Sequence, residues 1–407
     1  MKLQIKKLDK IAIFSLFFLG CLISYNRASN FSDGDAYSVI LAFLNMIDNW
    51  VYTPSRGAYG HPIPELLVGF FAFTIGTPFS NIFCFILFFL SLIILFKTFC
   101  NQQQSLTLFL LLILSNFYLL FENTNSIDYP IAIFFFSLGL YFLKFKKFVF
   151  SFIFFGMTIA SRANFLTFVY PILLIYFYDD LINKRLKNFL YPFIVVTVVG
   201  LFFYIPLFYL HNFTLNFLDL PFLTENTKGV GWYGGPKLNL ESLGPRFLYK
   251  IYLIVGIYSS ILFIFYSKKI YKNINFKLYN NQILLLVIFV NLFVFFFMPT
   301  KILIINPFII FLYIISFNNL NNKHIIFLIF FNLLQWFVTY EVATINYKHK
   351  DICKAVEATN YSFKLSLNHG KVYQHYFINQ DMTKCYSKYM GKYSENFING
   401  KPLFLSD

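Results

Sequence analysis

Residues 63–97, IPELLVGFFAFTIGTPFSNIFCFILFFLSLIILFK, decide the fold class of this chain. Residues 79–96 carry no charge, and at about 1.5 Å per helical residue they nearly span the roughly 30 Å hydrocarbon core of a bilayer. All 35 residues in one helix would extend about 52 Å, too far for a single crossing. Gly76, Thr77 and Pro78 interrupt the run, so the pattern predicts an interfacial helix over 63–75 and a membrane crossing over 79–96.

The composition of the whole chain agrees with this local pattern. Apolar residues make up 58% of the 407 residues and charged residues only 13%, whereas an average soluble domain carries roughly 25% charged residues. A soluble single domain is therefore excluded, and the expected fold class is an all-α polytopic membrane protein. Eleven transmembrane helices are predicted, over residues 11–25, 79–96, 105–121, 129–143, 148–160, 163–178, 188–211, 247–266, 281–298, 302–317 and 324–341.

The N-terminal apolar stretch is expected to remain in the mature protein as its first transmembrane helix and not to be cleaved as a signal peptide. The start, MKLQIKKLDK followed by an apolar stretch to Ile23, resembles a signal peptide, but no small-residue cleavage site precedes Tyr25. The hydrophilic parts fall into a first outer loop over 26–78, an outer loop over 212–246 and a tail over 346–407. The first loop is expected to hold a second interfacial helix over 35–50, and the Gly- and Pro-rich stretch 221–246 is expected to form an irregular cap.

The net charge of +15 predicts membrane topology, and no nucleic-acid partner is expected. If the chain crosses the membrane eleven times, one face of the membrane holds sixteen cations and only three acids, which are Asp9, Asp179 and Asp180. The opposite face, without the tail, holds eight cations and nine carboxylates. The positive-inside rule then predicts a cytoplasmic N-terminus and an extracytoplasmic tail, in a chain integral to the inner (plasma) membrane. In that tail, Cys353 and Cys385 could form a disulfide if the compartment is oxidising.

Asp33 and Asp35 lie immediately outside the first predicted span. Two carboxylates two residues apart at the end of a helix bundle are typical of a general base or a divalent-cation site. The alternative is that one of them caps the following helix, since Asp is a preferred N-cap residue. The two interpretations are compatible, because one Asp can cap while the other takes part in chemistry.

Arg56, His61 and Glu65 supply three ionisable groups in ten residues, next to Pro62 and Pro64, which are expected to start a helix. Alternatively, Glu65 only stabilises the first helical turn and His61 is a surface residue.

The next outer segments contribute Asp128, before Tyr129 and Pro130, and Arg162, at the junction of two short apolar segments. Asp128 could instead be an ordinary N-cap, and Arg162 could extend to lipid phosphate.

In their order and spacing these four segments resemble the GT-C superfamily of membrane glycosyltransferases, which includes protein O-mannosyltransferases and the aminoarabinose transferases of lipid A. The resemblance covers residues 1–210, which would form the common catalytic membrane module, and the helices of 211–345 and the tail 346–407 would be additions to it. It implies that Asp35, or else Asp33, is the general base that deprotonates the acceptor. Glu65 would hold a metal or orient the donor, and Asp128 matches the acidic residue of the second outer loop. Many members have an acidic pair there, whereas this chain has Asp128 and, six residues away, Glu122.

The residue types suit transfer of a sugar from a polyprenyl-phosphate donor to a hydroxyl of a lipid, glycan or protein acceptor, with inversion. The phosphate leaving group needs no general acid, so one carboxylate base and cations for the phosphate could suffice. Arg162, Arg56 and Arg246 are the candidates for phosphate, because a guanidinium binds it bidentately. If a divalent cation is present, we expect it to be held by the carboxylates of Asp35, Glu65 and Asp128, with His61 or His211 at most assisting.

Two functions of other classes remain as alternatives. A transporter or lipid flippase would need ionisable groups near mid-membrane, and the predicted spans from 79 to 338 contain essentially none. A relative of the superfamily without catalytic activity is the other alternative.

Overall fold

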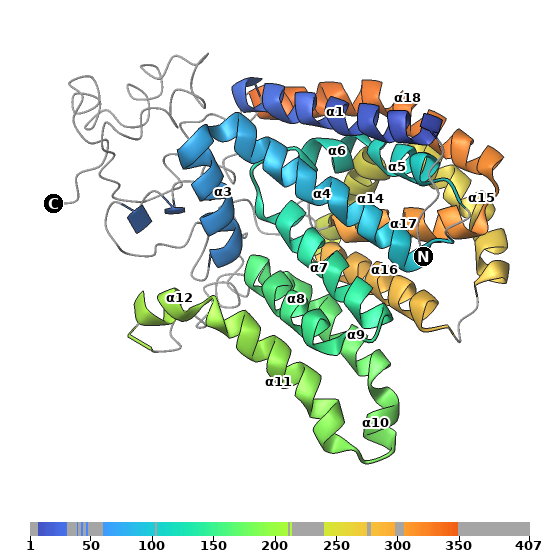
Figure 1. The fold of residues 1–407 in the computed structure, drawn as a ribbon. Coiled ribbons are helices and arrows are strands. Elements are labelled where there is room, and N and C mark those ends of the chain that lie inside the picture. Colours follow the sequence, from blue (N-terminus) through green and yellow to red (C-terminus); the bar gives the residue numbers. More distant parts are fainter. Residues whose placement is uncertain are drawn as a thin grey trace, which may run out of the picture.

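The computed structural model describes residues 7–30, 60–101, 104–210, 240–274, 278–297 and 305–348, together with 39, 42, 43, 46, 47, 212 and 213. All regular structure in these ranges is helical, as the sequence predicts (Figure 1). Three of the described helices are long and apolar enough to cross a membrane, namely α1 (Lys7–Asn30), α4 (Thr77–Phe99) and α16 (Tyr279–Phe297). The fold class predicted from the apolar runs is thus confirmed at the level of an all-helical chain with membrane-length helices.

Two further pairs of helices pass the same criteria only as bent spans. The chain bends by 85° between α5 (Leu106–Leu114) and α6 (Phe117–Asn123), and by 89° between α14 (Leu240–Val255) and α15 (Ile257–Asn273). The described helices therefore supply three to five candidate spans and do not confirm the count of eleven. Moreover, the irregular cap predicted over 221–246 is wrong at its end, since residues from Leu240 onward are helical.

The other apolar segments also form helices, some of them shorter than the predicted spans and some slightly longer. They are α7 (Asp128–Lys144), α8 (Phe148–Ser161), the 3-10 turn η1 (Ala163–Phe165), α9 (Leu166–Tyr176), α10 (Tyr178–Ile182), α11 (Leu186–Phe202), α12 (Ile205–Leu210), α17 (Asn306–Asn319) and the longer α18 (Asn322–Lys348). Residues 188–211, predicted as one span, break between α11 and α12. Pro206 explains the break, because proline has no N–H to bond the carbonyl four residues earlier.

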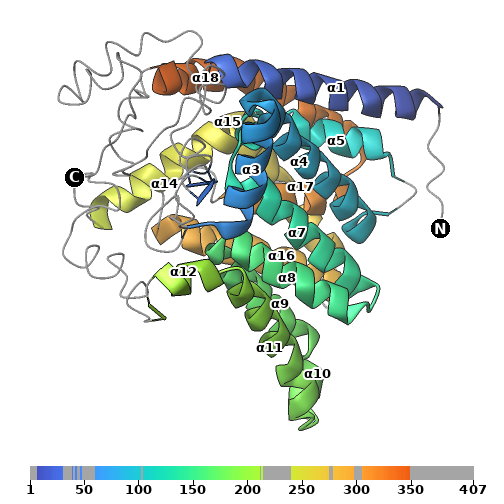
Figure 2. The same ribbon diagram turned by 60° about the vertical axis from the view of Figure 1, so that its left-hand side comes forward.

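The helix predicted over 63–75 is present as α3 (Pro62–Ile75), and its position at the membrane interface stays a prediction. Gly76 separates it from α4 with φ 98°, a conformation that a residue with a Cβ rarely adopts, and Pro78 lies in the first turn of α4. The chain changes direction sharply here (Figures 1 and 2). Most of the second predicted interfacial helix, 35–50, lies outside the described residues, although Phe43 of this segment packs against Phe73 of α3 with ring centroids 6.4 Å apart.

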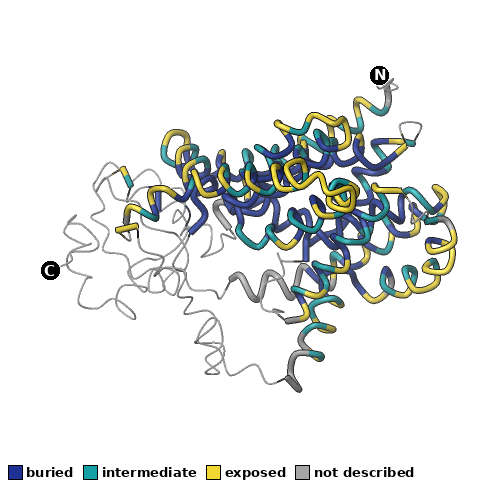
Figure 3. The backbone as a smooth tube through the Cα atoms, turned by 90° about the horizontal axis from the view of Figure 1, so that it is seen from below, coloured by how far each residue is buried: buried dark blue, intermediate teal, exposed yellow. Residues whose placement is uncertain are grey.

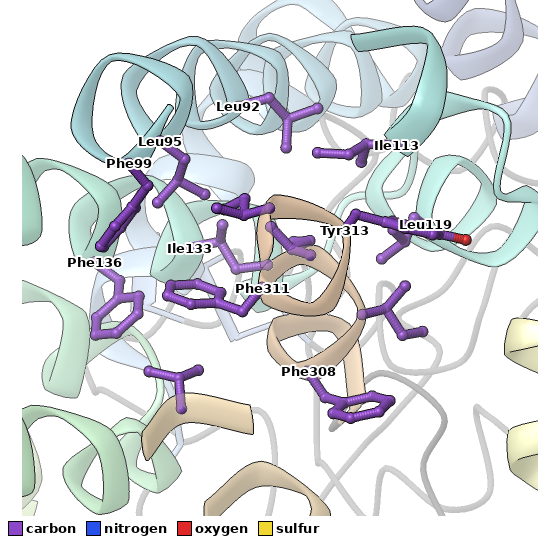
Figure 4. Close-up of a cluster of buried hydrophobic side chains, with 14 of the residues drawn as sticks. Leu92, Leu95, Phe99, Ile113, Leu119, Ile133, Phe136, Phe308, Phe311 and Tyr313 are labelled. Carbon is purple, nitrogen blue, oxygen red and sulfur yellow. The ribbon is translucent and has the colours of Figure 1, made fainter. Parts of the chain in front are cut away.

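The hydrophobic core is continuous across the domain boundary predicted near residue 210. Helix α17 lies in its centre, and its Phe311 contacts Phe99 of α4 and Phe136 of α7, with ring centroids 5.7 and 6.1 Å apart (Figure 4). Large apolar side chains such as Phe14 and Phe337 are exposed on the outside of the bundle, where Figure 3 shows the exposed residues surrounding the buried ones. This distribution suits a bundle surrounded by lipid tails, which are as apolar as the side chains.

A network of neutral polar side chains joins the two bends. Asn116 lies at the first bend, and its amide donates to the carbonyl of Ile254 beside the second bend (2.8 Å) and to the hydroxyl of Tyr313 (3.1 Å). From α18, Asn332 donates to the Leu112 carbonyl (3.3 Å), and the Trp336 indole donates to the Ser115 carbonyl (2.6 Å). Peptide groups released by a bend inside a bilayer need such partners, because no water is available to them.

The start of α1 and the end of α18 lie at opposite ends of the bundle (Figures 1 and 2). One end collects Thr107, whose hydroxyl donates to Asp9 (3.0 Å), and Lys144, whose ammonium donates to the Lys97 carbonyl (3.2 Å). The other end holds the starts of α3, α4 and α7 and the end of α8, where the candidate site lies (Figure 1).

We expect Asn116→Leu to lower the free energy of unfolding by about 2 kcal/mol, since it removes the cap on the Leu119 N–H and two cross-helix hydrogen bonds. Thermal unfolding of the detergent-solubilised protein measures the change. Asn183→Leu is the matched control, because the exposed Asn183 amide bonds only within its own helix end, to the Asp179 carbonyl (2.7 Å). Equal destabilisation by both variants would contradict a role for Asn116 in joining the bends.

Candidate functional site

His61 and Glu65 form the start of α3. His61 is the N-cap residue, and its backbone N–H donates to the Glu65 carboxylate (2.9 Å). Pro62 and Pro64 lack an N–H and suit the first turn of a helix, where backbone N–H groups have no partner within the helix. The Glu65 carboxylate therefore stabilises the helix start, in agreement with the alternative interpretation of this residue. The alternative interpretation of His61 as a surface residue is wrong, because His61 is only 5% exposed.

Asp128 and Arg162 form a buried ion pair between α7 and α8. The Arg162 guanidinium donates from Nη1 to Asp128 Oδ2 and lies 4.1 Å from the centroid of the Tyr129 ring. Asp128 is completely buried and Arg162 is 8% exposed. The Arg162 side chain therefore does not extend to lipid phosphate, because it is buried and its guanidinium bonds Asp128.

The local backbone explains how both residues reach the pair. Helix α7 begins at Asp128 itself, with Ile127 as N-cap and no side-chain cap, so the interpretation of Asp128 as an N-cap is wrong. Arg162 follows the last residue of α8 in an extended conformation (φ −158°), before η1 starts at Ala163. Each charge thus lies at a helix end, where the side chain can turn toward the neighbouring helix.

Asp128 also connects this pair to α3. His61 Nε2 lies 3.7 Å from Asp128 Oδ2, the same oxygen that accepts from Arg162. Four predicted site residues therefore come together from three helices: His61, Glu65, Asp128 and Arg162, here called the Asp128 cluster. Their sequence positions span about a hundred residues, so only the packing of α3, α7 and α8 brings them together.

The remaining predicted site residues are not placed by the structure. Asp33, Asp35, Arg56 and His211 lie outside the described residues, and so do Cys353 and Cys385 of the tail. Arg246 belongs to α14, but its side chain is not described. The assignment of the general base to Asp35 or Asp33 consequently stays a prediction.

Arg27 and the loop 124–127 are further parts of the site, and neither is among the site residues predicted from the sequence. The Arg27 guanidinium donates to the Thr124 hydroxyl (3.3 Å) and lies 3.7 Å from the centroid of the Phe121 ring. On the same loop, the Ser126 hydroxyl donates to Asn81 Oδ1 (2.6 Å). The sequence does contain an indication of this loop, because Asn123–Ser126 is a run of four polar residues between two apolar segments. The run does not show which residues elsewhere in the chain bond to it.

The Asp128 cluster by itself does not complete a metal site. Among the described residues no three His, Cys, Asp or Glu side chains lie close enough to hold a metal ion. Asp128 Oδ2 is already engaged by Arg162, so a cation bound there would compete with the guanidinium. A divalent cation would need at least one more ligand from the residues that the structure does not describe, such as the predicted Asp35.

Comparison with known proteins finds no family model, no curated protein and no solved structure that matches this chain. The resemblance to the GT-C superfamily therefore stays a hypothesis based on the motifs.

We expect Arg162→Met to lower the free energy of unfolding by about 3 to 5 kcal/mol, because it leaves the completely buried Asp128 carboxylate without its guanidinium. Asp128→Asn is expected to have a smaller effect once Arg162 is already Met, and a double-mutant cycle of thermal unfolding measures this coupling.

The matched control for this cycle is the pair of Arg185 and Asp180, which lie 2.9 Å apart with Arg185 56% exposed. Arg185→Met should change stability by less than about 1 kcal/mol, because exposed ion pairs contribute little. Similar coupling energies for the two pairs would refute the special role of the buried one.

Proposed function

We propose that this chain is an integral membrane glycosyltransferase that transfers a sugar from a polyprenyl-phosphate donor to an acceptor hydroxyl. The observation that supports it is the convergence of His61, Glu65, Asp128 and Arg162 in one buried cluster at one end of the helix bundle. These residues come from three of the four segments that resemble GT-C motifs. Sugar transfer from a lipid carrier needs charged groups held at the end of a bundle that otherwise contacts lipid.

In this proposal Arg162 holds the donor phosphate. A planar guanidinium can bond two phosphate oxygens at once, and in a partly desolvated site this attraction is stronger than in water. In the absence of donor, Asp128 keeps the guanidinium in place and balances its charge. The donor phosphate would then share or take over the guanidinium, and His61 also lies beside Asp128, 3.7 Å from its Oδ2.

The proposed reaction is a single displacement at the anomeric carbon. Asp35, or alternatively Asp33, removes the proton of the acceptor hydroxyl, and the oxygen forms a bond to the anomeric carbon. The bond from that carbon to the phosphate oxygen breaks, and the lipid phosphate leaves with the electron pair. The acceptor is a lipid, a glycan or a protein, and the sugar is transferred with inversion. Should a divalent cation take part, it would screen the phosphate charge and be held by carboxylates.

The bent spans favour a transporter as the second candidate. Transporters often build substrate sites from broken helices near the bilayer midplane, and here two bends are joined through Asn116 and the Ile254 carbonyl. The side chains described around these bends are neutral amides, hydroxyls and an indole, and they are hydrogen-bonded to one another or to backbone carbonyls. Ion coupling needs a titratable or ion-coordinating group, so this candidate ranks below the transferase.

The activity test uses the purified protein in nanodiscs with a polyprenyl-phosphate sugar and a mixture of acceptors. We expect Asp35→Asn to reduce kcat by about 10²- to 10⁴-fold, as is usual for loss of a general base. Arg162→Lys should raise the KM for the donor by about tenfold or more, because the bidentate contact is lost. Sugar release and transfer are followed by mass spectrometry, and Arg185→Met is the control that leaves both parameters unchanged.

If Asp35→Asn and Asp33→Asn together left sugar transfer intact, the base assignment would be wrong. Uptake of a labelled solute into proteoliposomes, without any transfer of sugar, would favour the transporter instead.

We also propose the membrane orientation, with eleven crossings, a cytoplasmic N-terminus and an extracytoplasmic tail in the inner (plasma) membrane. A fluorescent protein that folds only in the cytoplasm should fluoresce when fused to residue 1 and not when fused to residue 407. Reporters fused after Lys147 and after Asn125 should again lie on the cytoplasmic and outer sides, respectively. Fluorescence from both terminal fusions would rule out an odd number of crossings.

A further inference from the structure

Arg27 is buried at the same end of the bundle as the Asp128 cluster. Its side chain comes from the last turn of α1 and is only 2% exposed. A charged group at such a position is costly and is usually functional or held by specific contacts. The stacking on Phe121 and the hydrogen bond to Thr124 both direct the guanidinium to the end of α6 and the loop that follows it.

The loop 124–127 leads directly into Asp128, and all its residues are buried. Thr124 is fixed twice, since its hydroxyl accepts from Arg27 and donates to the Phe121 carbonyl (2.8 Å). Ser126 is held by α4, through Asn81 (2.6 Å) and through Ser80. The amide of Asn81 in turn donates to the Ser24 carbonyl of α1 (3.2 Å), one turn before Arg27.

Asp128 is thus held in two ways, through the loop that precedes it and through its carboxylate. Helices α1 and α4 hold the loop that precedes it, while Arg162 of α8 and His61 of α3 contact its carboxylate. Because hydrogen bonds depend steeply on distance and angle, a small shift of the loop would change both contacts of the carboxylate. The same carboxylate orients the guanidinium that would bind the donor phosphate.

We infer that Arg27 is a positioning residue of this site, which acts by anchoring the loop 124–127 and so holding Asp128 against Arg162 and His61. The anchoring itself depends only on the contacts of Arg27, whereas its effect on a sugar donor rests on the proposed function. Arg27 is therefore not expected to touch the reacting atoms.

Cys84 provides a reporter for the loop that needs no enzymatic activity. Its thiol lies 3.8 Å from the Ile127 carbonyl, to which it donates, and it is completely buried. Alkylation of such a thiol requires a local opening, so its rate reports how often the loop moves away. Cys100 is the internal control, because it is also buried and lies at the other end of α4.

In the experiment, the full-length protein in nanodiscs is treated with N-ethylmaleimide, and alkylation of Cys84 and Cys100 is quantified by peptide mass spectrometry. Arg27→Met should accelerate alkylation of Cys84 by about tenfold, as expected for loss of one buried charged hydrogen bond, and leave Cys100 unchanged. Arg27→Lys should give a Cys84 alkylation rate between those of the wild type and Arg27→Met, because the ammonium keeps the charge but cannot spread over the Phe121 ring. Thr124→Val removes the acceptor instead of the arginine and should act in the same direction, so it serves if Arg27→Met does not accumulate.

An unchanged rate at Cys84, or equal acceleration at Cys84 and Cys100, would overturn the inference, since Arg27 would then be irrelevant to the loop or merely a general stabiliser. A second measurement separates the inference from the proposed function. If the protein transfers sugar, Arg27→Met should raise the donor KM several-fold more than it lowers kcat, and Arg27→Lys should restore part of the KM. If it transfers none, the alkylation rates still decide whether Arg27 anchors the loop.

Discussion

Inside a bilayer no water is available to bond a free peptide group, and this constraint accounts for much of the helical part that the structure describes. It explains why the described residues form helices and turns, since a helix bonds its own backbone. It also explains where the helices can end or bend. At the two bends, the side chains of Asn116, Asn332 and Trp336 bond backbone carbonyls, and the Tyr313 hydroxyl links the two asparagine amides. At Gly76, the turn of the backbone is made where α3 meets α4, at the end of the bundle.

The same constraint makes the buried charges informative. Asp128, Arg162, Arg27 and Glu65 are almost completely removed from solvent, and each one contacts a specific partner at one end of the bundle. Replacing a buried pair by apolar residues is often neutral or even stabilising, so such a pair is weak evidence for a purely structural role. A cluster that combines two carboxylates, a guanidinium and an imidazole fits better with a site that must meet a charged substrate.

The position of α17 connects this site to the C-terminal half of the chain. Its phenylalanines pack among α4 and α7, the helices that carry Asn81 and Asp128 (Figure 4). At the opposite end, Asn318 and Gln104 tie α17 to α4 and to the start of α5 through the carbonyls of Phe99 and Phe317. The helices after residue 240 therefore support the geometry of the helices that form the Asp128 cluster.

Much of the helical plan could be predicted from the sequence alone, because an apolar run and its length report directly on the medium that surrounds it. This applies to the all-helical class, to the break at Gly76 and to the start of α3 at its two prolines. The candidate residues His61, Glu65, Asp128 and Arg162 could also be named, since charges are rare in this chain and the rare ones stand out. The partners of these residues could not be predicted. Whether Asp128 caps its own helix or pairs with Arg162, and whether Arg27 reaches Thr124, depends on which helices lie side by side. The bend at Asn116 likewise exists because Ile254 and Tyr313, distant in sequence, supply its hydrogen-bond partners, and only the tertiary structure brings them there.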